Sequence, residues 1–221
     1  MLIAARQSML MGGAKLPYDA EVEYLESTGA QWIDTGILAN SDLKVECTFR
    51  MLERPTSFKW IFAARMQDII GGGYGFGCDG TGYITSDYNG RVSISERFNS
   101  GTIYTVVKDA NVCSINGTTL LNTATVFTQS YTLPILGMRT ADGAVNLGVI
   151  PKCEIFYVRI YAPTLVRDYI PVRVGSGSSA VGYLYDRTNP TGGPLGNGLY
   201  GNAGTGAFVI GPDKEHLPYR I

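Results

Sequence analysis

The chain has 221 residues, of which 45% are hydrophobic and 17% are charged, and its formal net charge is −1. A chain of this length and apolar content can bury a full core as one domain, so we do not expect intrinsic disorder. No basic block occurs, which argues against nucleic-acid binding, and no run of 18 apolar residues occurs, which argues against a membrane-spanning helix.

Residues 1–17 form an apolar arm that precedes the first predicted strand. Arg6 interrupts its apolar part, so it is a poor secretory signal and we interpret it as part of the mature chain. We expect this arm to be an assembly element that packs against a sister subunit or another protein; the alternative is that it folds back onto its own domain. The residues predicted to make that contact are Met1, Leu2, Ile3, Met9, Leu10 and Met11.

Short apolar or alternating runs, separated by Gly, Asn and Asp, fill residues 18–213, and residues 214–221 form a short tail. With 28 glycines and no clean helical periodicity, this pattern is typical of many short β-strands. The predicted strands are Glu21–Leu25, Gln31–Thr35, Leu43–Leu52, Trp60–Arg65, Tyr74–Cys78, Gly82–Thr85, Val92–Arg97, Ile103–Lys108, Val112–Ile115, Thr118–Leu121, Leu133–Met138, Lys152–Tyr161, Gly182–Tyr185 and Ala207–Ile210.

Two Asn-Gly dipeptides predict tight hairpins. Asn116-Gly117 separates two of these strands, and Asn89-Gly90 precedes another. Asn-Gly is the preferred pair for a type I′ turn, because both central residues need a positive φ. Fourteen short strands with such turns predict an all-β fold, a two-sheet antiparallel jelly-roll sandwich with no helix longer than about three turns.

Two glycine-rich segments need interpretation. The run at 71–77 alternates Gly with aromatic residues and lacks the helix of a phosphate-binding loop, so we expect a strand that another element crosses closely. Residues 175–204 are rich in Gly, Ser and Pro, and predict a long irregular excursion of the kind that often carries function.

The four cysteines show no Cys-x-x-Cys spacing, which gives no sign of a zinc or redox site. Cys47 occupies an apolar position of an alternating strand, so we expect it to face the core. We expect all four thiols to be free, the alternative being one or two disulfides. They are Cys47, Cys78, Cys113 and Cys153.

Catalytic residues are scarce. The single histidine, His216, lies in the C-terminal tail, and no strand carries the closely spaced acid pair of a glycosidase. Asp79, Asp87 and Asp142 lie near Gly or Asn, so we interpret them as turn acids; calcium binding is the alternative. We therefore predict no enzymatic activity, no metal site and no cofactor.

Aromatic side chains are the remaining candidates for ligand binding. Trp60, Tyr88 and Tyr200 are the three we select, because an aromatic ring can stack on a sugar; the alternative is that they fill the core. The same alternatives apply to Trp32, Tyr74, Tyr83 and Tyr185.

Four blocks in order carry a resemblance to a known group. They are residues 22–36 (VEYLESTGAQWIDTG), residues 113–117 (CSING), residues 155–173 (IFYVRIYAPTLVRDYIPVR) and residues 182–213, which begin GYLYD and include LYGNAGTGAF. Together they resemble the laminin-G-like, concanavalin A-like jelly rolls of phage and prophage structural proteins of gut bacteria. The stretch 188–197 looks longer than is usual for that group, and the calcium-binding acids of its lectin members are not recognisable.

This resemblance implies a sandwich used for glycan or protein adhesion. We expect a non-enzymatic virion structural protein, such as a decoration, head-fibre or tail-associated subunit, that contacts other virion proteins or sister subunits and is located on the virion. A host-surface glycan is a further expected partner, while nucleic acid and membrane are not. The alternatives are a carbohydrate-binding module of a bacterial surface protein and, least favoured, a glycosidase of the same fold.

Overall fold

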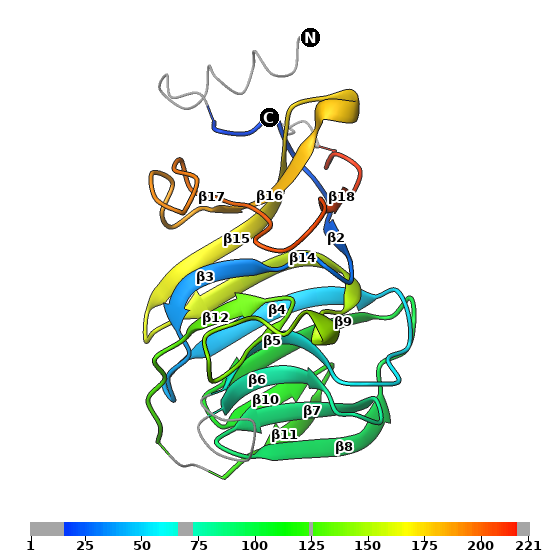
Figure 1. Cartoon of the computed structure of the whole chain (residues 1–221), viewed down its shortest axis with the longest axis vertical. Coiled ribbons are helices and arrows are strands. Elements are labelled where there is room, and N and C mark those ends of the chain that lie inside the picture. Colours follow the sequence, from blue (N-terminus) through cyan, green and yellow to red (C-terminus); the bar gives the residue numbers. More distant parts are fainter. Residues whose placement is uncertain (1–15, 66–72, 124–125, 216–221) are drawn as a thin grey trace, which may run out of the picture.

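The computed structural model describes residues 16–65, 73–123 and 126–215. Two antiparallel β-sheets pack face to face, which confirms the predicted two-sheet sandwich (Figure 1). The only helices among the described residues are two three-residue 3-10 turns, Leu147–Val149 and Gly177–Ser179, so the expected absence of long helices also holds there. No helix of this described part is long and apolar enough to cross a membrane.

One sheet has eleven strands and runs from β11 to β17. Along its main path the strands are β11 (Thr118–Leu121), β10 (Val112–Ile115), β9 (Ile103–Asp109), β4 (Lys44–Met51), β14 (Lys152–Tyr161), β15 (Leu165–Val174), β16 (Val181–Asp186) and β17 (Leu199–Tyr200). Three short strands extend it: β1 (Ala20–Glu21) pairs with β15, β2 (Leu25–Thr28) pairs with β14, and β18 (Val209–Ile210) pairs with β2.

The other sheet has seven strands and covers the inner face of the first. Its main path is β3 (Ile33–Leu38), β12 (Thr132–Ile135), β5 (Lys59–Arg65), β6 (Gly73–Cys78), β7 (Tyr83–Tyr88) and β8 (Arg91–Arg97), and β13 (Met138–Arg139) pairs with β5 in parallel. The edge strand β8 lies near β11, and the opposite edge strand β3 lies near β17. The sandwich therefore has two open sides, each bounded by one edge strand from either sheet.

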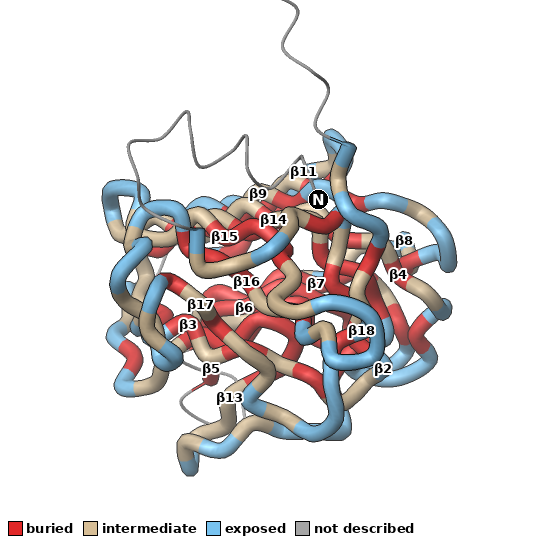
Figure 2. The backbone as a smooth tube through the Cα atoms, turned by 90° about the horizontal axis from the view of Figure 1, so that it is seen from above, coloured by how far each residue is buried: buried red, intermediate tan, exposed pale blue. Residues whose placement is uncertain are grey.

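The core follows from the alternation of apolar residues along the strands. In β4 every second residue is fully buried, as a half-buried strand requires (Figure 2). Phe49 of β4 lies at the centre of an aromatic cluster that joins both sheets, with ring centroids 6.3 Å from Phe76, 5.6 Å from Phe98 and 5.6 Å from Tyr104. The four cysteines are buried and free, as expected.

Both predicted hairpins form. Asn116 and Gly117 have φ values of 44° and 90°, as the turn between β10 and β11 requires, and Asn89 has a φ of 50° between β7 and β8. The glycine-rich run forms a strand, β6, over its described part, as predicted. The element that approaches it is not a crossing segment but β5, its paired neighbour: a Cβ added at Gly77 would lie 2.1 Å from the Lys59 carbonyl oxygen, next to the register shift in β5.

Lys108 is the one lysine that is fully buried among the described residues. Its Nζ donates hydrogen bonds to Ser86 Oγ (2.9 Å) and to the Ala110 carbonyl oxygen (3.3 Å), and it lies 4.8 Å from the ring centroid of Tyr74. Ser86 Oγ in turn donates to Asn122 Oδ1 at 2.8 Å. Because β9 and β7 belong to different sheets, this chain of hydrogen bonds ties the layers together, and burial lowers the pKa of Lys108 to about 8.

Strand β15 was not predicted. It carries Pro171 at its centre and charged residues near its start, features that argue against a buried strand. Its first half pairs with β14, whereas its second half pairs with β16 on one side and with β1 on the other. Three predicted strands also differ in extent: 21–25 is divided between β1 and β2, 133–138 is divided between β12 and β13, and 207–210 shortens to β18.

The two ends of the described chain pair with each other. Val22 and Asp213 form an antiparallel bridge, and the Lys214 amide donates to the Glu21 carbonyl at 2.9 Å. Arg173 of β15 closes this arrangement with an ion pair to Asp213, whose Nη2–Oδ2 distance is 2.7 Å. The first and last described segments of the chain are therefore held side by side.

Candidate functional site

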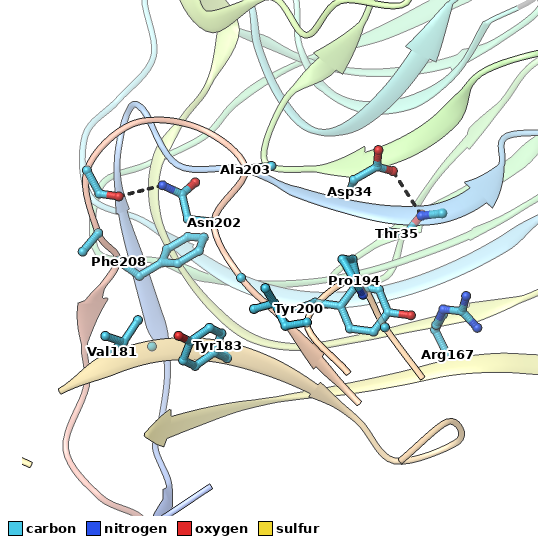
Figure 3. A pocket seen from close by; sticks show the side chains of 17 residues that line it. Asp34, Thr35, Arg167, Val181, Tyr183, Pro194, Tyr200, Asn202, Ala203 and Phe208 are labelled. Atoms are coloured by element: carbon cyan, nitrogen blue, oxygen red, sulfur yellow. Dashed lines mark hydrogen bonds between the residues drawn. The ribbon is translucent and has the colours of Figure 1, made fainter. Parts of the chain in front are cut away.

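A cleft of about 730 Å³ lies at the open side of the sandwich where β3 of one sheet faces β16 and β17 of the other (Figure 3). Its described lining comes from four separate stretches of the chain: 34–36, Arg167, 181–183 and 193–208. This volume is within the range of pockets that hold small ligands. The cleft is thus formed by the tertiary fold and by no single motif.

The walls of the cleft are aromatic and apolar. Tyr183 contributes a half-buried ring, and Val181 and Leu195 contribute exposed aliphatic side chains. The rings of Tyr200 and Phe208 also border the cleft, but they are only 3% and 5% exposed and belong to the core. Between them lie small residues that are at least partly exposed and leave the backbone open to a ligand; these are Gly36, Gly193, Gly201, Ala203, Gly206 and Ala207. A surface of this kind offers both faces for ring stacking and backbone groups for hydrogen bonding.

Asn202 holds the loop that forms one wall. Its Oδ1 accepts from the amides of Trp32 (3.0 Å) and Gly204 (2.8 Å), and its Nδ2 donates to the Gly206 carbonyl at 2.7 Å. The Ala203 amide donates to the Trp32 carbonyl at 2.8 Å. These bonds attach the loop to the start of β3, so the wall is held in place before any ligand arrives.

Asp34 is the carboxylate of the cleft lining, and it is fully engaged. Its Oδ1 accepts from Thr132 Oγ1 (2.7 Å) and from the Gly36 amide (3.1 Å), and its Oδ2 pairs with Arg139 Nη2 at 2.5 Å. A carboxylate with these partners is a structural anchor for β3. It is poorly suited to act as a general acid or base.

Arg167 supplies the positive charge of the lining, and its guanidinium lies over the ring of Tyr200 at 5.8 Å from the centroid. The nearest carboxylate is that of Asp186, with 3.5 Å between Arg167 Nε and Asp186 Oδ2. The cleft therefore combines ring faces, open backbone and one guanidinium, which is the composition of a binding site.

Of our three candidate binding residues, Tyr200 borders the cleft, but its ring is 3% exposed and packs on Tyr169, so it offers little surface for stacking. Trp60 and Tyr88 are buried, with 1% and 5% of their surface exposed, so the structure corrects their assignment as stacking residues. Trp60 packs in a small cluster with Ala63 and Met138, and the Tyr88 hydroxyl donates to the Ser41 carbonyl at 2.9 Å. Rings enclosed in this way have no free face for a ligand.

The other predicted aromatic residues have different surroundings. Tyr74 is fully buried and Tyr185 nearly so. Half-buried Trp32 and Tyr83 lie under the guanidinium groups of Arg139 and Arg97, respectively. None of the four lines the cleft.

Sequence reasoning missed most of the cleft lining, including Arg167, Tyr183 and Phe208. For Arg167 a signal was present. Alternate residues of a strand lie on the same face of the sheet, so Arg167 shares its face with Tyr169, which is buried. A charged residue on a buried face is unusual and marks a candidate site. The predicted excursion at 175–204 contains regular β16, but its irregular part does contribute Gly193 and Leu195 to the cleft.

Two of the three predicted turn acids are confirmed. Asp79 Oδ1 accepts from the amides of Thr81 and Tyr83, and Asp142 Oδ1 accepts from the Ala144 amide. Asp87 is a correction, because it is buried in β7 and pairs with Arg65 at 3.1 Å. No cluster of metal-ligating side chains occurs within the described ranges.

The predicted assembly residues Met1, Leu2, Ile3, Met9, Leu10 and Met11 lie outside the described residues, as does His216. In comparisons with known proteins, no family model matches the chain, and no curated protein shows significant similarity to it.

Proposed function

We propose that the protein is a non-enzymatic adhesive module that holds a glycan in the cleft between β3, β16 and β17. The observation that carries this proposal is the cleft itself: about 730 Å³ of space bounded by the half-buried ring of Tyr183, by the exposed side chains of Val181 and Leu195, and by open backbone. Sugars present apolar ring faces and hydroxyl groups at once, and one accessible ring with aliphatic side chains and open backbone around it matches both.

We propose a binding module and not a glycosidase because of the carboxylates that line the cleft. Hydrolysis of a glycosidic bond requires two carboxyl groups that flank the bond. The described lining of this cleft offers Asp34 alone, and that side chain is held by Arg139 and Thr132. We therefore expect the cleft to bind a sugar chain without cleaving it.

Substituting Tyr183 tests the cleft. We expect Tyr183→Ala to weaken binding to a recognised glycan by at least about tenfold, since a lost ring contact of roughly 1.4 kcal/mol has that effect. The measurement is calorimetric titration after a screen of bacterial, mucin and plant polysaccharides. Tyr157→Ala is the matched control, because Tyr157 is also half-buried but does not line the cleft.

Three results would argue against this proposal: no glycan of the panel bound, equal loss of affinity in both tyrosine variants, or sugar released above a blank. Folding of each variant is verified by circular dichroism and urea unfolding. A weakened variant with an unchanged unfolding midpoint locates the ligand in the cleft.

The setting that we propose for this module is the surface of a virion, with the arm at residues 1–17 bound to another virion protein or a sister subunit. Its support is the resemblance to phage structural proteins and the apolar character of the arm. Electron microscopy of purified particles should show the sandwich on the outside with the arm at its attachment point. The alternative, a carbohydrate-binding module of a bacterial surface protein, predicts particles that lack this chain.

A further inference from the structure

Arg167 occupies a position where the fold would ordinarily place an apolar side chain. It is two residues before Tyr169, which is fully buried, and alternate residues of a strand lie on the same face of the sheet. Arg167 therefore projects from the inner face of its sheet, at the side where the sandwich opens into the cleft (Figure 3). A buried arginine at such a position destabilises the folded state unless its N–H groups donate hydrogen bonds to acceptors.

Most of the donors of Arg167 have no acceptor among the described residues. Nη1 donates to the Val166 carbonyl at 2.7 Å, and this is the one hydrogen bond that the guanidinium makes there. Nε lies 3.5 Å from Asp186 Oδ2, and both atoms are buried without a hydrogen-bond partner. A guanidinium has five N–H donors in a fixed planar fork, so an edge of this one remains available.

Asp186 forms an ion pair with Arg167 but no hydrogen bond to it. Asp186 Oδ1 accepts from the Asp168 amide (3.0 Å), the Thr188 amide (3.0 Å) and Thr188 Oγ1 (2.7 Å). These three bonds fix the carboxylate in the turn after β16. It balances the charge of Arg167 at a distance while leaving the guanidinium free to donate to another acceptor.

The surroundings indicate what that acceptor is. The Arg167 side chain is only 17% exposed, so a hydrogen bond to its charge is weakly screened. No second cation lines the described part of the cleft, so a phosphate dianion would be poorly compensated. The single planar guanidinium of Arg167, which lies beside the ring of Tyr200, can instead donate two parallel hydrogen bonds to one planar carboxylate on a sugar ring.

We propose that Arg167 binds the carboxylate of an acidic sugar, so that the ligand is a glycan that contains uronic or sialic acid residues. This inference rests on the proposed glycan binding and specifies its ligand class. The guanidinium donates its free N–H groups to the carboxylate, while the aromatic and small residues of the cleft contact the sugar ring.

The first test uses the unmodified full chain. Its affinity is measured by calorimetry for polygalacturonate, hyaluronan and polysialic acid, each in native form and after reduction of the carboxyl groups to alcohols. We expect at least one native polymer to bind about tenfold or more tightly than its reduced form. Equal affinities for both forms of every polymer that binds would overturn the proposal.

The second test compares two Arg→Lys variants. Arg167→Lys keeps the charge that faces Asp186 but removes the planar fork, so the preference for the native polymer should fall to about twofold or less. Arg54→Lys is the matched control, because Arg54 is exposed and does not line this cleft, and its preference should be unchanged. A preference that persists in Arg167→Lys contradicts the assignment.

The outcomes separate this inference from the function on which it rests. Binding of neutral glycans alone, weakened by Tyr183→Ala, would leave the adhesive function standing and refute the acidic ligand. Absence of binding to any polymer, neutral or acidic, would refute both. Preferential binding of a phosphorylated glycan over every carboxylated one would also refute the carboxylate.

Discussion

Replacing Lys108 by methionine should remove a pH dependence of stability, so that the stability of the variant relative to wild type falls by about 3 kcal/mol as the pH rises from 7 to 10.5. Burial between the sheets holds the pKa of this amine at about 8, whereas its ordinary value is 10.5. Between these values the unfolded chain binds more protons than the folded one, so wild-type stability rises with pH. Below pH 8 the full cost of the buried charge is present, and above 10.5 it is gone.

Urea unfolding of both proteins, followed by tryptophan fluorescence across this pH range, measures the effect. Tyrosine ionisation is common to both proteins and cancels in the difference. Lys44→Met is the control, since the hydrogen bond from Lys44 to Glu46 raises the pKa of that lysine and its pH dependence has the opposite sign. Parallel stability profiles for wild type and Lys108→Met would show that the amine is not buried as described.

Replacing Phe49 by alanine should destabilise the protein by about 3–5 kcal/mol, a large share of the roughly 5–15 kcal/mol that stabilises a domain. Phe49 is fully buried, and its ring contacts aromatic residues of both sheets, Phe76 of β6 and Tyr104 of β9 among them. Deleting the ring opens a cavity between layers that cannot close without moving the backbone. In urea unfolding we expect the midpoint to fall while the m-value stays constant.

Phe58→Ala provides the comparison for this substitution. Phe58 is 38% exposed and interacts with Arg91, whose guanidinium lies 4.8 Å from its ring centroid. Its loss should destabilise the protein by about 1 kcal/mol or less. Similar effects of the two substitutions would mean that the Phe49 cluster does not hold the two sheets together.

Local signals in the sequence were sufficient to predict the class of fold. Alternation along β4 gave the buried face that contains Phe49, and Asn116-Gly117 specified a hairpin, because each depends on residues within a few positions. β15 escaped prediction because Pro171 normally excludes a buried strand. Here its ring is accommodated and its carbonyl accepts from the Val22 amide, a contact made by a segment far away in sequence.

The site was largely beyond the reach of local signals. Aromatic residues were reasonable candidates for ligand binding as a class. Whether a given ring lies in the core or on the surface, however, depends on the face of the sheet from which its side chain projects. The strand register shifts between Trp60 and Phe62, so simple alternation cannot tell which way these rings point. The cleft joins Asp34, Arg167, Tyr183 and Tyr200, which only the packing of one sheet edge against another brings together.

The pairing of the chain ends has a mechanical consequence. Val22 and Asp213 are antiparallel partners, so the described chain runs in the same direction from Val22 toward its start as from Asp213 toward its end. A force that separates these two segments would load their hydrogen bonds one after another, beginning with the bond from the Lys214 amide to the Glu21 carbonyl. These end contacts would yield before the aromatic core around Phe49 carried load.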